Sequence, residues 1–182
     1  MIELKLLTKE ILSELWQIAY SQPTPEWKKL DAPYFQDYSH YPSFTDFQQE
    51  MAIRFANNPN RLGIFQDDRL VGTVSRYWEC KETRWMELGL AIYQEQDWGT
   101  GIGTRALQLW LEQTFQDYLE LERLGLTTWS GNPGMMALAE KVGLQQEACI
   151  RKVRYYQGIY YDSVKYGILR SEWQRIRKEE NV

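Results

Sequence analysis

The 182-residue sequence is poor in the residues that bind metals and form disulfides. It has two cysteines, Cys80 and Cys149, and one histidine, His40. Two cysteines cannot form the disulfide framework of a small secreted domain, and one histidine beside them cannot complete the usual four Cys/His ligands of a zinc site. We therefore expect two buried free thiols, no metal and a reducing compartment.

Long apolar runs and an excess of positive charge are absent as well. No stretch approaches the roughly 18 consecutive apolar residues that a membrane-spanning helix needs. Residues 1–5 lack the basic region and apolar core of a signal peptide. The net charge is −4, which argues against a nucleic-acid-binding surface. These absences predict a cytoplasmic protein whose partners include neither a membrane nor a nucleic acid.

The composition that remains is typical of a folded domain, with many aromatic residues. Hydrophobic residues make up 43% of the chain, charged residues 25% and aromatic residues 14%. A chain of this length and composition can bury a stable core without disulfides or a structural metal. We predict one domain over residues 1–182. Residues 1–60 supply an N-terminal strand, helices and aromatic loops, and residues 61–173 supply the larger core and a C-terminal hairpin.

Hydrophobic periodicity predicts strands and helices in mixed order. We expect strands at residues 2–7, 61–66, 70–78, 85–92, 124–129, 147–156 and 160–169. We expect helices at residues 43–57, 101–118 and 132–142, and an earlier one capped by Thr8. Prolines and aromatic residues between 21 and 42 predict a long loop, either a functional lid or an aromatic cover over the core. This order predicts an α/β fold on a mixed sheet.

The most informative segment is a glycine-rich turn, residues 96–104, which follows a strand and begins a helix. Gly99, Gly101 and Gly103 leave the backbone N–H groups free to point at one ligand, and a helix N-terminus adds roughly half a positive charge. Together they predict an anion site suited to phosphate. The alternative is a tight turn that needs glycine only for its conformation.

Two common phosphate motifs do not fit this turn. A P-loop ends in Gly-Lys-Ser/Thr, and no lysine follows here. Residues 101–106 satisfy the dinucleotide pattern G-x-G-x-x-A, but the next strand ends without the acidic residue that would hold a ribose. A nicotinamide or flavin site is therefore not expected.

The segment Trp98–Thr104 resembles the acetyl-CoA pyrophosphate loop of the GNAT superfamily of N-acetyltransferases, whose pattern is Gln/Arg-x-x-Gly-x-Gly/Ala. Gly101 and Gly103 match its glycines. Trp98 at the Gln/Arg position resembles the branch that acetylates the N-terminal alanine of ribosomal proteins. Asn132 with residues 140–144, and residues 154–173, are similar to later blocks of that branch. The resemblance covers about residues 62–173.

The resemblance implies a mostly antiparallel GNAT-like sheet flanked by helices, with a splayed strand pair that admits acetyl-CoA beside residues 85–92. It implies that amides of the turn bind the pyrophosphate, and that the backbone of the fourth strand binds the pantetheine and polarises the thioester carbonyl. On this basis the residues that bind acetyl-CoA are Leu90, Ala91, Ile92, Trp98, Gly99, Thr100, Gly101, Ile102, Gly103, Thr104 and Asn132.

The implied reaction is direct attack of a neutral amine on the thioester, which requires the amine to lose a proton. Glu87 on the fourth strand is our candidate base. The alternative is a carboxylate that pairs with an arginine or binds the substrate ammonium. We expect Ser130 and Asn132 near the leaving thiolate, where they orient a water. Asn132 also suits the N-cap of the next helix. Ala139 replaces the tyrosine that many family members use as proton donor.

The branch predicts that the acceptor is the N-terminal amine of a protein or peptide. Two alternatives stay open: a small amine such as a polyamine, amino sugar or antibiotic, and a non-catalytic acyl-CoA-binding module. A small polycation calls for an acidic groove, and the aromatic loop offers Glu26, Asp31 and Asp37 against Lys28 and Lys29. Exposed aromatic edges and the terminal hairpin predict a homodimer.

Overall fold

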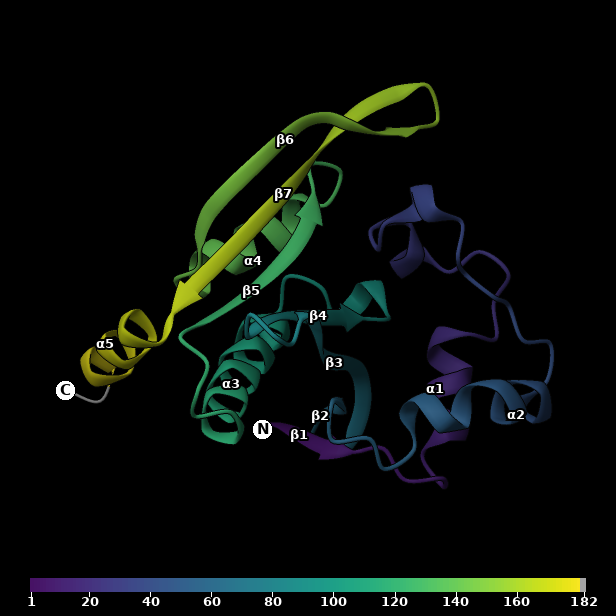
Figure 1. The fold of residues 1–182 in the computed structure, drawn as a ribbon. Coiled ribbons are helices and arrows are strands. Elements are labelled where there is room, and N and C mark those ends of the chain that lie inside the picture. The colour runs from purple at the N-terminus through teal and green to yellow at the C-terminus, as the bar shows by residue number, and fades with distance from the viewer. Residues whose placement is uncertain (181–182) are drawn as a thin grey trace. The chain divides into compact units, whose positions relative to one another are not determined.

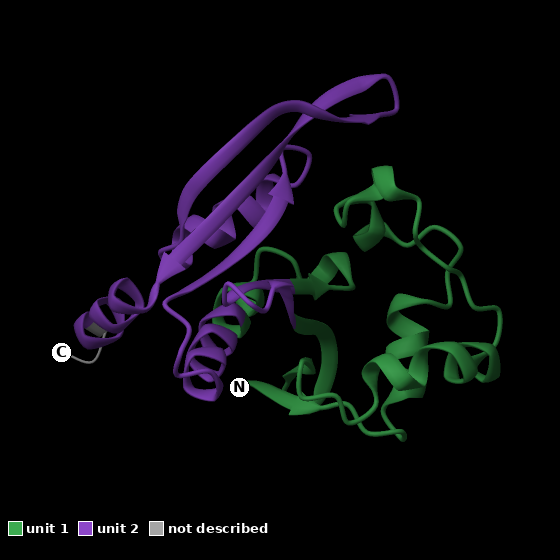
Figure 2. Ribbon diagram, in the orientation of Figure 1, with its two compact units in different colours: residues 1–75, 90–106 green, residues 76–89, 107–182 purple. Residues whose placement is uncertain are grey.

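The computed structural model describes residues 1–180 and divides into two compact units (Figure 2). Unit 1 comprises residues 1–75 and 90–106, and unit 2 comprises residues 76–89 and the chain from residue 107 onward. Two strands and one helix run from one unit into the other. The organisation of residues 1–182 as one domain stays a prediction.

The sheet combines antiparallel strands with one parallel pair (Figure 1). Its strand order is β1-β2-β3-β4-β5-β7-β6, and β4 pairs with β5 in parallel. This confirms the predicted mixed, mostly antiparallel sheet. The strands are β1 (Ile2–Leu6), β2 (Arg61–Gln66), β3 (Arg69–Cys80), β4 (Trp85–Ile92), β5 (Arg123–Trp129), β6 (Gln145–Tyr156) and β7 (Ile159–Leu169). The helices are α1 (Leu12–Ala19), α2 (Phe44–Phe55), α3 (Ile102–Asp117), α4 (Pro133–Val142) and α5 (Arg170–Glu180), with short 3-10 helices η1 (Glu26–Lys29), η2 (Pro33–Phe35) and η3 (Glu95–Asp97).

The core of unit 1 is an aromatic and aliphatic cluster beneath the loop between α1 and α2. Trp27 from this loop is 7% exposed, and its indole N–H donates to the carbonyl of Ala19 at 3.0 Å. The hydroxyl of Tyr38 donates to the carbonyl of Gln22 at 2.6 Å. The loop therefore lies on the core of its own unit as an aromatic cover, which is the second of the two predicted alternatives.

In unit 2, alternate residues of β4, β5 and β7 point to opposite faces of the sheet. Met86, Leu124, Leu126, Tyr166 and Ile168 are buried on one face. The hydroxyl of Tyr166 donates to Glu140 of α4 at 3.0 Å, so α4 covers this apolar face. The opposite face carries the charged residues of the candidate site described below.

Two predictions about individual residues were wrong, and one helix was not predicted. Thr8 does not cap α1, because α1 begins four residues later, with Ile11 at the N-cap position and no capping side chain. Helix α5 was not predicted, since its polar sequence has few periodic apolar positions and is fixed mainly by Trp173, which is 3% exposed. Both cysteines are free thiols, but neither is buried: Cys80 is half-buried, and Cys149 on β6 is exposed.

Metal-binding groups and membrane-spanning helices are not found in the described part of the chain. Within residues 1–180, no group of three or more Asp, Glu, His or Cys side chains is arranged to hold a metal ion. In the same part of the chain, no helix combines the length and the apolar character needed to cross a membrane.

Tyr93 gives unit 1 a predictable response to alkaline pH. Its side chain is 5% exposed, and its hydroxyl lies 2.7 Å from that of Thr73. Burial raises the pKa of Tyr93 from 10.0 to about 12. Because the folded state holds this proton more tightly than the unfolded chain, the stabilisation is complete below pH 10 and is lost as the pH approaches 12.

We therefore expect Tyr93→Phe to flatten the fall in stability above pH 10 by about 1.4 kcal/mol per pH unit. Urea denaturation at a series of pH values measures this slope. Tyr155→Phe is the matched control, because Tyr155 is 60% exposed. If Tyr93→Phe leaves the fall in stability above pH 10 unchanged, Tyr93 is not the group responsible for it.

Candidate active site

The predicted glycine turn lies in unit 1, at the start of α3. Gly99 and Gly101 have φ values of +70° and +90°, which favour glycine, and no atom lies within 4 Å of the place where a Cβ would stand. The first N–H groups of the 16-residue α3, from Ile102 onward, lack partners within the helix. The turn therefore presents an open set of backbone donors at the positive end of a helix dipole.

Side-chain hydrogen bonds hold the base of this turn. The indole N–H of Trp98 donates to the carbonyl of Ile92 at 2.9 Å, and the hydroxyl of Thr100 donates to the carbonyl of Asp97 at 2.7 Å. Arg69 donates to both carboxylate oxygens of Asp97, at 2.6 and 3.0 Å. Asp97 is 6% exposed, and its hydrogen bonds raise the pKa of Arg69. Trp98 thus ties the turn to the end of β4.

The second half of β4 is more open than the first. Met86, Glu87 and Leu88 are buried, whereas residues 89–92 are half-buried. Gly72 of β3 passes close to this segment, since a Cβ there would stand 2.2 Å from the carbonyl oxygen of Ala91. The predicted cofactor residues Leu90, Ala91 and Ile92 therefore lie on a strand segment with accessible surface.

The parallel pairing of β4 with β5 is short. It joins Met86 to Leu124 and Glu87 to Gly125. The next residues of β4 within unit 2, Leu88 and Gly89, have no register partner on β5 in the described chain. The two strands therefore part immediately after Glu87, as a splayed pair requires.

Glu87 lies at this fork with no exposed surface. Its Oε1 accepts hydrogen bonds from the indole of Trp85 at 2.7 Å and from Nη1 of Arg123 at 3.1 Å. Its Oε2 accepts one from the hydroxyl of Thr127 at 3.3 Å. The general-base role of Glu87 stays a prediction, and this geometry matches the alternative of a carboxylate paired with an arginine.

Arg123 links Glu87 to a second carboxylate on the same face of unit 2. Its Nε donates to the two oxygens of Glu147 at 3.1 and 3.0 Å. Burial by itself lowers the pKa of Arg123, but the hydrogen bonds to Glu147 and Glu87 outweigh burial and raise it. We call Glu87, Arg123 and Glu147 the fork cluster. Its signal in the sequence was a pair of glycines within predicted strands, Gly125 and Gly167.

Ser130 and Asn132 follow β5 and take part in local hydrogen bonds. The N–H of Met135 donates to Oδ1 of Asn132 at 3.0 Å, so Asn132 caps α4. The N–H of Asp162 donates to Oγ of Ser130 at 2.9 Å, which leaves the hydroxyl hydrogen of Ser130 for another acceptor. Ala139 on α4 is fully buried, and its methyl side chain cannot donate a proton.

A cavity of about 580 Å³ lies within unit 1, beside α1 and the start of β3. Its two charged lining residues are both engaged. Glu14 accepts a hydrogen bond from the N–H of Leu70 at 3.1 Å, and Arg69 binds Asp97. The cavity therefore shares Arg69 with the base of the glycine turn.

Comparisons with known proteins agree with this arrangement. The model of the acetyltransferase (GNAT) domain family matches residues 8–145. The protein named "Putative ribosomal N-acetyltransferase YdaF" of Bacillus subtilis (strain 168) is 29% identical over 143 residues, which cover 75% of this chain and 77% of that protein.

Solved structures share the fold at low sequence identity. A spermidine N-acetyltransferase from Vibrio cholerae, in complex with CoA and spermine, has a TM-score of 0.71 at 19% identity, over 95% of this chain and 98% of that one. A GNAT-family acetyltransferase from Bacillus anthracis has a TM-score of 0.69 at 16% identity, over 92% and 94%. The chain therefore belongs to the GNAT acetyltransferase family and is, as the sequence predicts, an acetyl-CoA-dependent N-acetyltransferase.

Proposed function

We propose that the enzyme transfers the acetyl group of acetyl-CoA to the N-terminal amine of a protein or peptide. The binding of acetyl-CoA is supported mainly by the open glycine turn. In this turn Gly99 and Gly101 have positive φ values and directly precede the 16-residue helix α3. The similarity to a protein named as a ribosomal N-acetyltransferase supports the choice of acceptor.

The proposed cofactor site combines the turn with the end of β4. A pyrophosphate carries negative charge, which suits the backbone donors of residues 98–104 and the helix dipole behind them. The half-buried residues Leu90, Ala91 and Ile92 offer backbone groups for the pantetheine arm. Asn132, at the start of α4, is proposed to lie near the sulfur.

The proposed reaction is a direct acyl transfer. The lone pair of the amine attacks the thioester carbonyl carbon, a C–N bond forms, and the carbonyl oxygen becomes an oxyanion. Collapse of this intermediate breaks the C–S bond and releases the CoA thiolate. The nitrogen loses one proton and the thiolate gains one. We propose that the hydroxyl of Ser130, or a water that it orients, passes a solvent proton to the thiolate and is itself reprotonated, because Ala139 cannot serve.

An α-amine reduces the need for a strong base. Its ordinary pKa is about 7.7–8.0, so roughly a third of it is neutral near pH 7.5, whereas a lysine-type amine with a pKa of about 10.4 is almost wholly charged. Proton loss to solvent is then sufficient for the proposed acceptor. A buried, hydrogen-bonded Glu87 is compatible with this scheme.

The charges of the aromatic loop favour a peptide over a polyamine. Nζ of Lys28 lies 3.2 Å from Asp31 and 2.7 Å from Asp37, and Nζ of Lys29 lies 2.5 Å from Glu26. A polycation needs several uncompensated carboxylates, and here three carboxylates share two lysines, which leaves a net charge of only −1 among these five residues. The small amine and the non-catalytic module remain the alternatives that an experiment must separate.

A screen of acceptors tests the proposal. We expect release of free CoA with a peptide that begins with alanine, at a kcat/KM roughly 100-fold above that for spermidine, a difference of about 2.7 kcal/mol in the transition state. The same peptide with a blocked N-terminus is the control. A higher kcat/KM for spermidine than for the peptide would identify a small amine as the acceptor. Binding of acetyl-CoA without turnover on any acceptor would favour the non-catalytic module.

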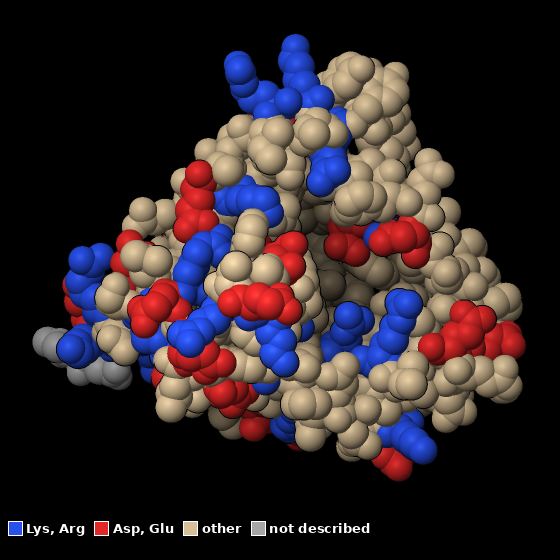
Figure 3. Space-filling view, in the orientation of Figure 1, with Lys and Arg blue, Asp and Glu red and all other residues tan. Residues whose placement is uncertain are grey.

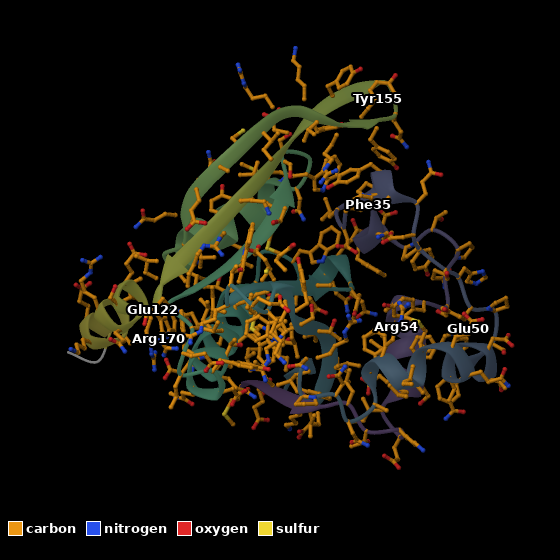
Figure 4. All side chains as sticks on the ribbon, in the orientation of Figure 1. Phe35, Glu50, Arg54, Glu122, Tyr155 and Arg170 are labelled. Carbon is orange, nitrogen blue, oxygen red and sulfur yellow. The ribbon has the colours of Figure 1, made fainter. Side chains whose placement is uncertain are left out.

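The homodimer also stays a proposal, and the β6–β7 hairpin supports it. Ile150, Tyr155 and Tyr160 on this hairpin are 49%, 60% and 61% exposed. Figure 4 shows Tyr155 close to the hairpin turn, and Figure 3 shows Lys and Arg side chains projecting from the same end of unit 2. β6 is the last strand in the sheet order, so its edge is available to another chain.

The cytoplasmic location stays a prediction as well.

A further inference from the structure

We propose that the fork cluster is a positioning device: Glu87, Arg123 and Glu147 hold β4 and β5 together at the point where they part, and Glu87 acts through this cluster rather than as the base. The inference rests on the proposed function, in which the acetyl end of acetyl-CoA binds along the second half of β4. Figure 1 shows β4, β5, β7 and β6, the strands that the cluster connects.

The fork cluster lies at the end of the β4–β5 pairing. The β4–β5 pairing ends at Glu87 and Gly125. Immediately beyond it, the hydroxyl of Thr127 on β5 donates to Glu87 on β4, so a side-chain hydrogen bond continues the connection after the backbone pairing has ended. The place where the strands separate is therefore set by side chains, and Glu87 accepts the bonds from both Thr127 and Arg123.

Two facing glycines make room for the cluster. Gly125 is the register partner of Glu87 on one side and of Gly167 on the other. A Cβ at Gly125 would stand 2.3 Å from Nη2 of Arg123, and a Cβ at Gly167 would stand 2.3 Å from Oε1 of Glu147. The guanidinium and the carboxylate therefore lie against the backbone of β5 and β7, in positions from which a Cβ at Gly125 or Gly167 would displace them.

The environment of Glu87 argues against proton transfer to it. The carboxylate has no exposed surface, and both of its oxygens accept hydrogen bonds, from Trp85, Arg123 and Thr127. The remaining acceptor site, on Oε2, has no exposed surface, so proton transfer from an amine would require a path from the substrate to open. A buried carboxylate left without its arginine is costly, whereas removal of both charges together costs less.

Three variants separate positioning from base catalysis. In Glu87→Gln, the amide oxygen still accepts from Arg123 and Trp85. In Arg123→Met, Glu87 stays buried and loses its arginine partner. In Glu87→Gln/Arg123→Met, the buried charge is gone. The exposed Glu79 of β3 supplies the matched control, Glu79→Gln. Each variant is assayed for kcat, for the KM of acetyl-CoA, for the pH profile of kcat/KM, and for the Kd of adenosine 3′,5′-bisphosphate, which lacks the pantetheine arm.

A positioning role predicts that Arg123→Met has the largest effect. Its KM for acetyl-CoA is expected to rise about 10-fold or more, the double variant to recover at least part of this loss, and Glu87→Gln to stay within about 5-fold of wild type with an unshifted pH profile. The Kd of adenosine 3′,5′-bisphosphate is expected to stay the same throughout. If Arg123→Met fails to fold, the double variant is expected to fold, and Arg123→Lys to show an intermediate KM.

The opposite ranking would overturn the inference. A base role predicts that Glu87→Gln lowers kcat about 100-fold or more, removes the acidic limb of the pH profile, and is not relieved in the double variant. A double variant as unstable as Arg123→Met would also contradict positioning. Wild-type protein that releases no CoA with any amine would overturn the proposed function instead, so the two failures are distinguishable.

Discussion

Gly101→Glu is expected to weaken the binding of acetyl-CoA roughly 100-fold or more, which corresponds to about 2.7 kcal/mol. Gly101 has a φ of +90°, which a side chain rarely adopts, and the space at its Cβ position is open. A carboxylate at this position would stand among the backbone donors proposed to bind the pyrophosphate and would repel it. Isothermal titration with acetyl-CoA measures the change.

Two further variants show whether charge or backbone strain causes the loss. Gly101→Ala introduces the strain without the charge, and we expect it to weaken binding about 10-fold at most. Gly158→Glu places the same side chain at a glycine of similar φ, +82°, in the β6–β7 turn, and we expect wild-type affinity. Wild-type affinity in Gly101→Glu would show that the turn does not bind the phosphates.

Arg170→Met is expected to lower the free energy of unfolding by about 3 kcal/mol. The guanidinium of Arg170 donates to three backbone carbonyls that follow or end α3: Leu121 at 2.7 Å, Tyr118 at 2.7 Å and Phe115 at 3.1 Å. It also lies over the ring of Phe115, 4.7 Å from its centroid. Figure 4 shows Arg170 where β7 leads into α5, next to Glu122, whose carbonyl accepts the N–H of Arg170 at 2.8 Å.

The size of this effect follows from the loss of a charged donor to carbonyls at a helix end, where no helical N–H replaces it. Urea denaturation of the whole chain, followed by circular dichroism, measures this change. Arg175→Met is the matched control, because Arg175 lies exposed on the same helix, and we expect a change below about 0.5 kcal/mol. Equal stability of the two variants would show that Arg170 does not hold α5 to the end of α3.

The local parts of the site could be predicted from the sequence. Three glycines at the start of a helix indicate a backbone anion site whatever the rest of the fold does, and the structure places Gly99 and Gly101 at positive φ. The capping of α4 by Asn132 is equally local. The strands over residues 61–66 and 85–92 match β2 and β4, because period-two patterns and turn residues bound them.

The long-range parts could not be predicted, because they depend on the register of the strands. Arg69 and Asp97 are 28 positions apart, and Glu87 and Arg123 are 36 apart. The sequence singled out Glu87 as a candidate base, but nothing in it pairs Glu87 with Arg123 or Arg69 with Asp97. The pairing of Glu87, Gly125 and Gly167 across three strands brings Arg123 and Glu147 together over the two glycines. A glycine within a strand is the one sequence signal for such a close approach.

The products of a single turnover distinguish an enzyme that acetylates N-terminal amines from a protein that only binds acetyl-CoA. Enzyme is mixed with acetyl-CoA and a peptide that begins with alanine, and free thiol and acetylated peptide are quantified together. We expect one thiol and one acetylated N-terminus per acetyl-CoA consumed, with both products absent when the peptide is N-terminally blocked. Tight binding of acetyl-CoA without either product on any amine would contradict the proposed acetyl transfer, and so would thiol release that does not depend on an amine.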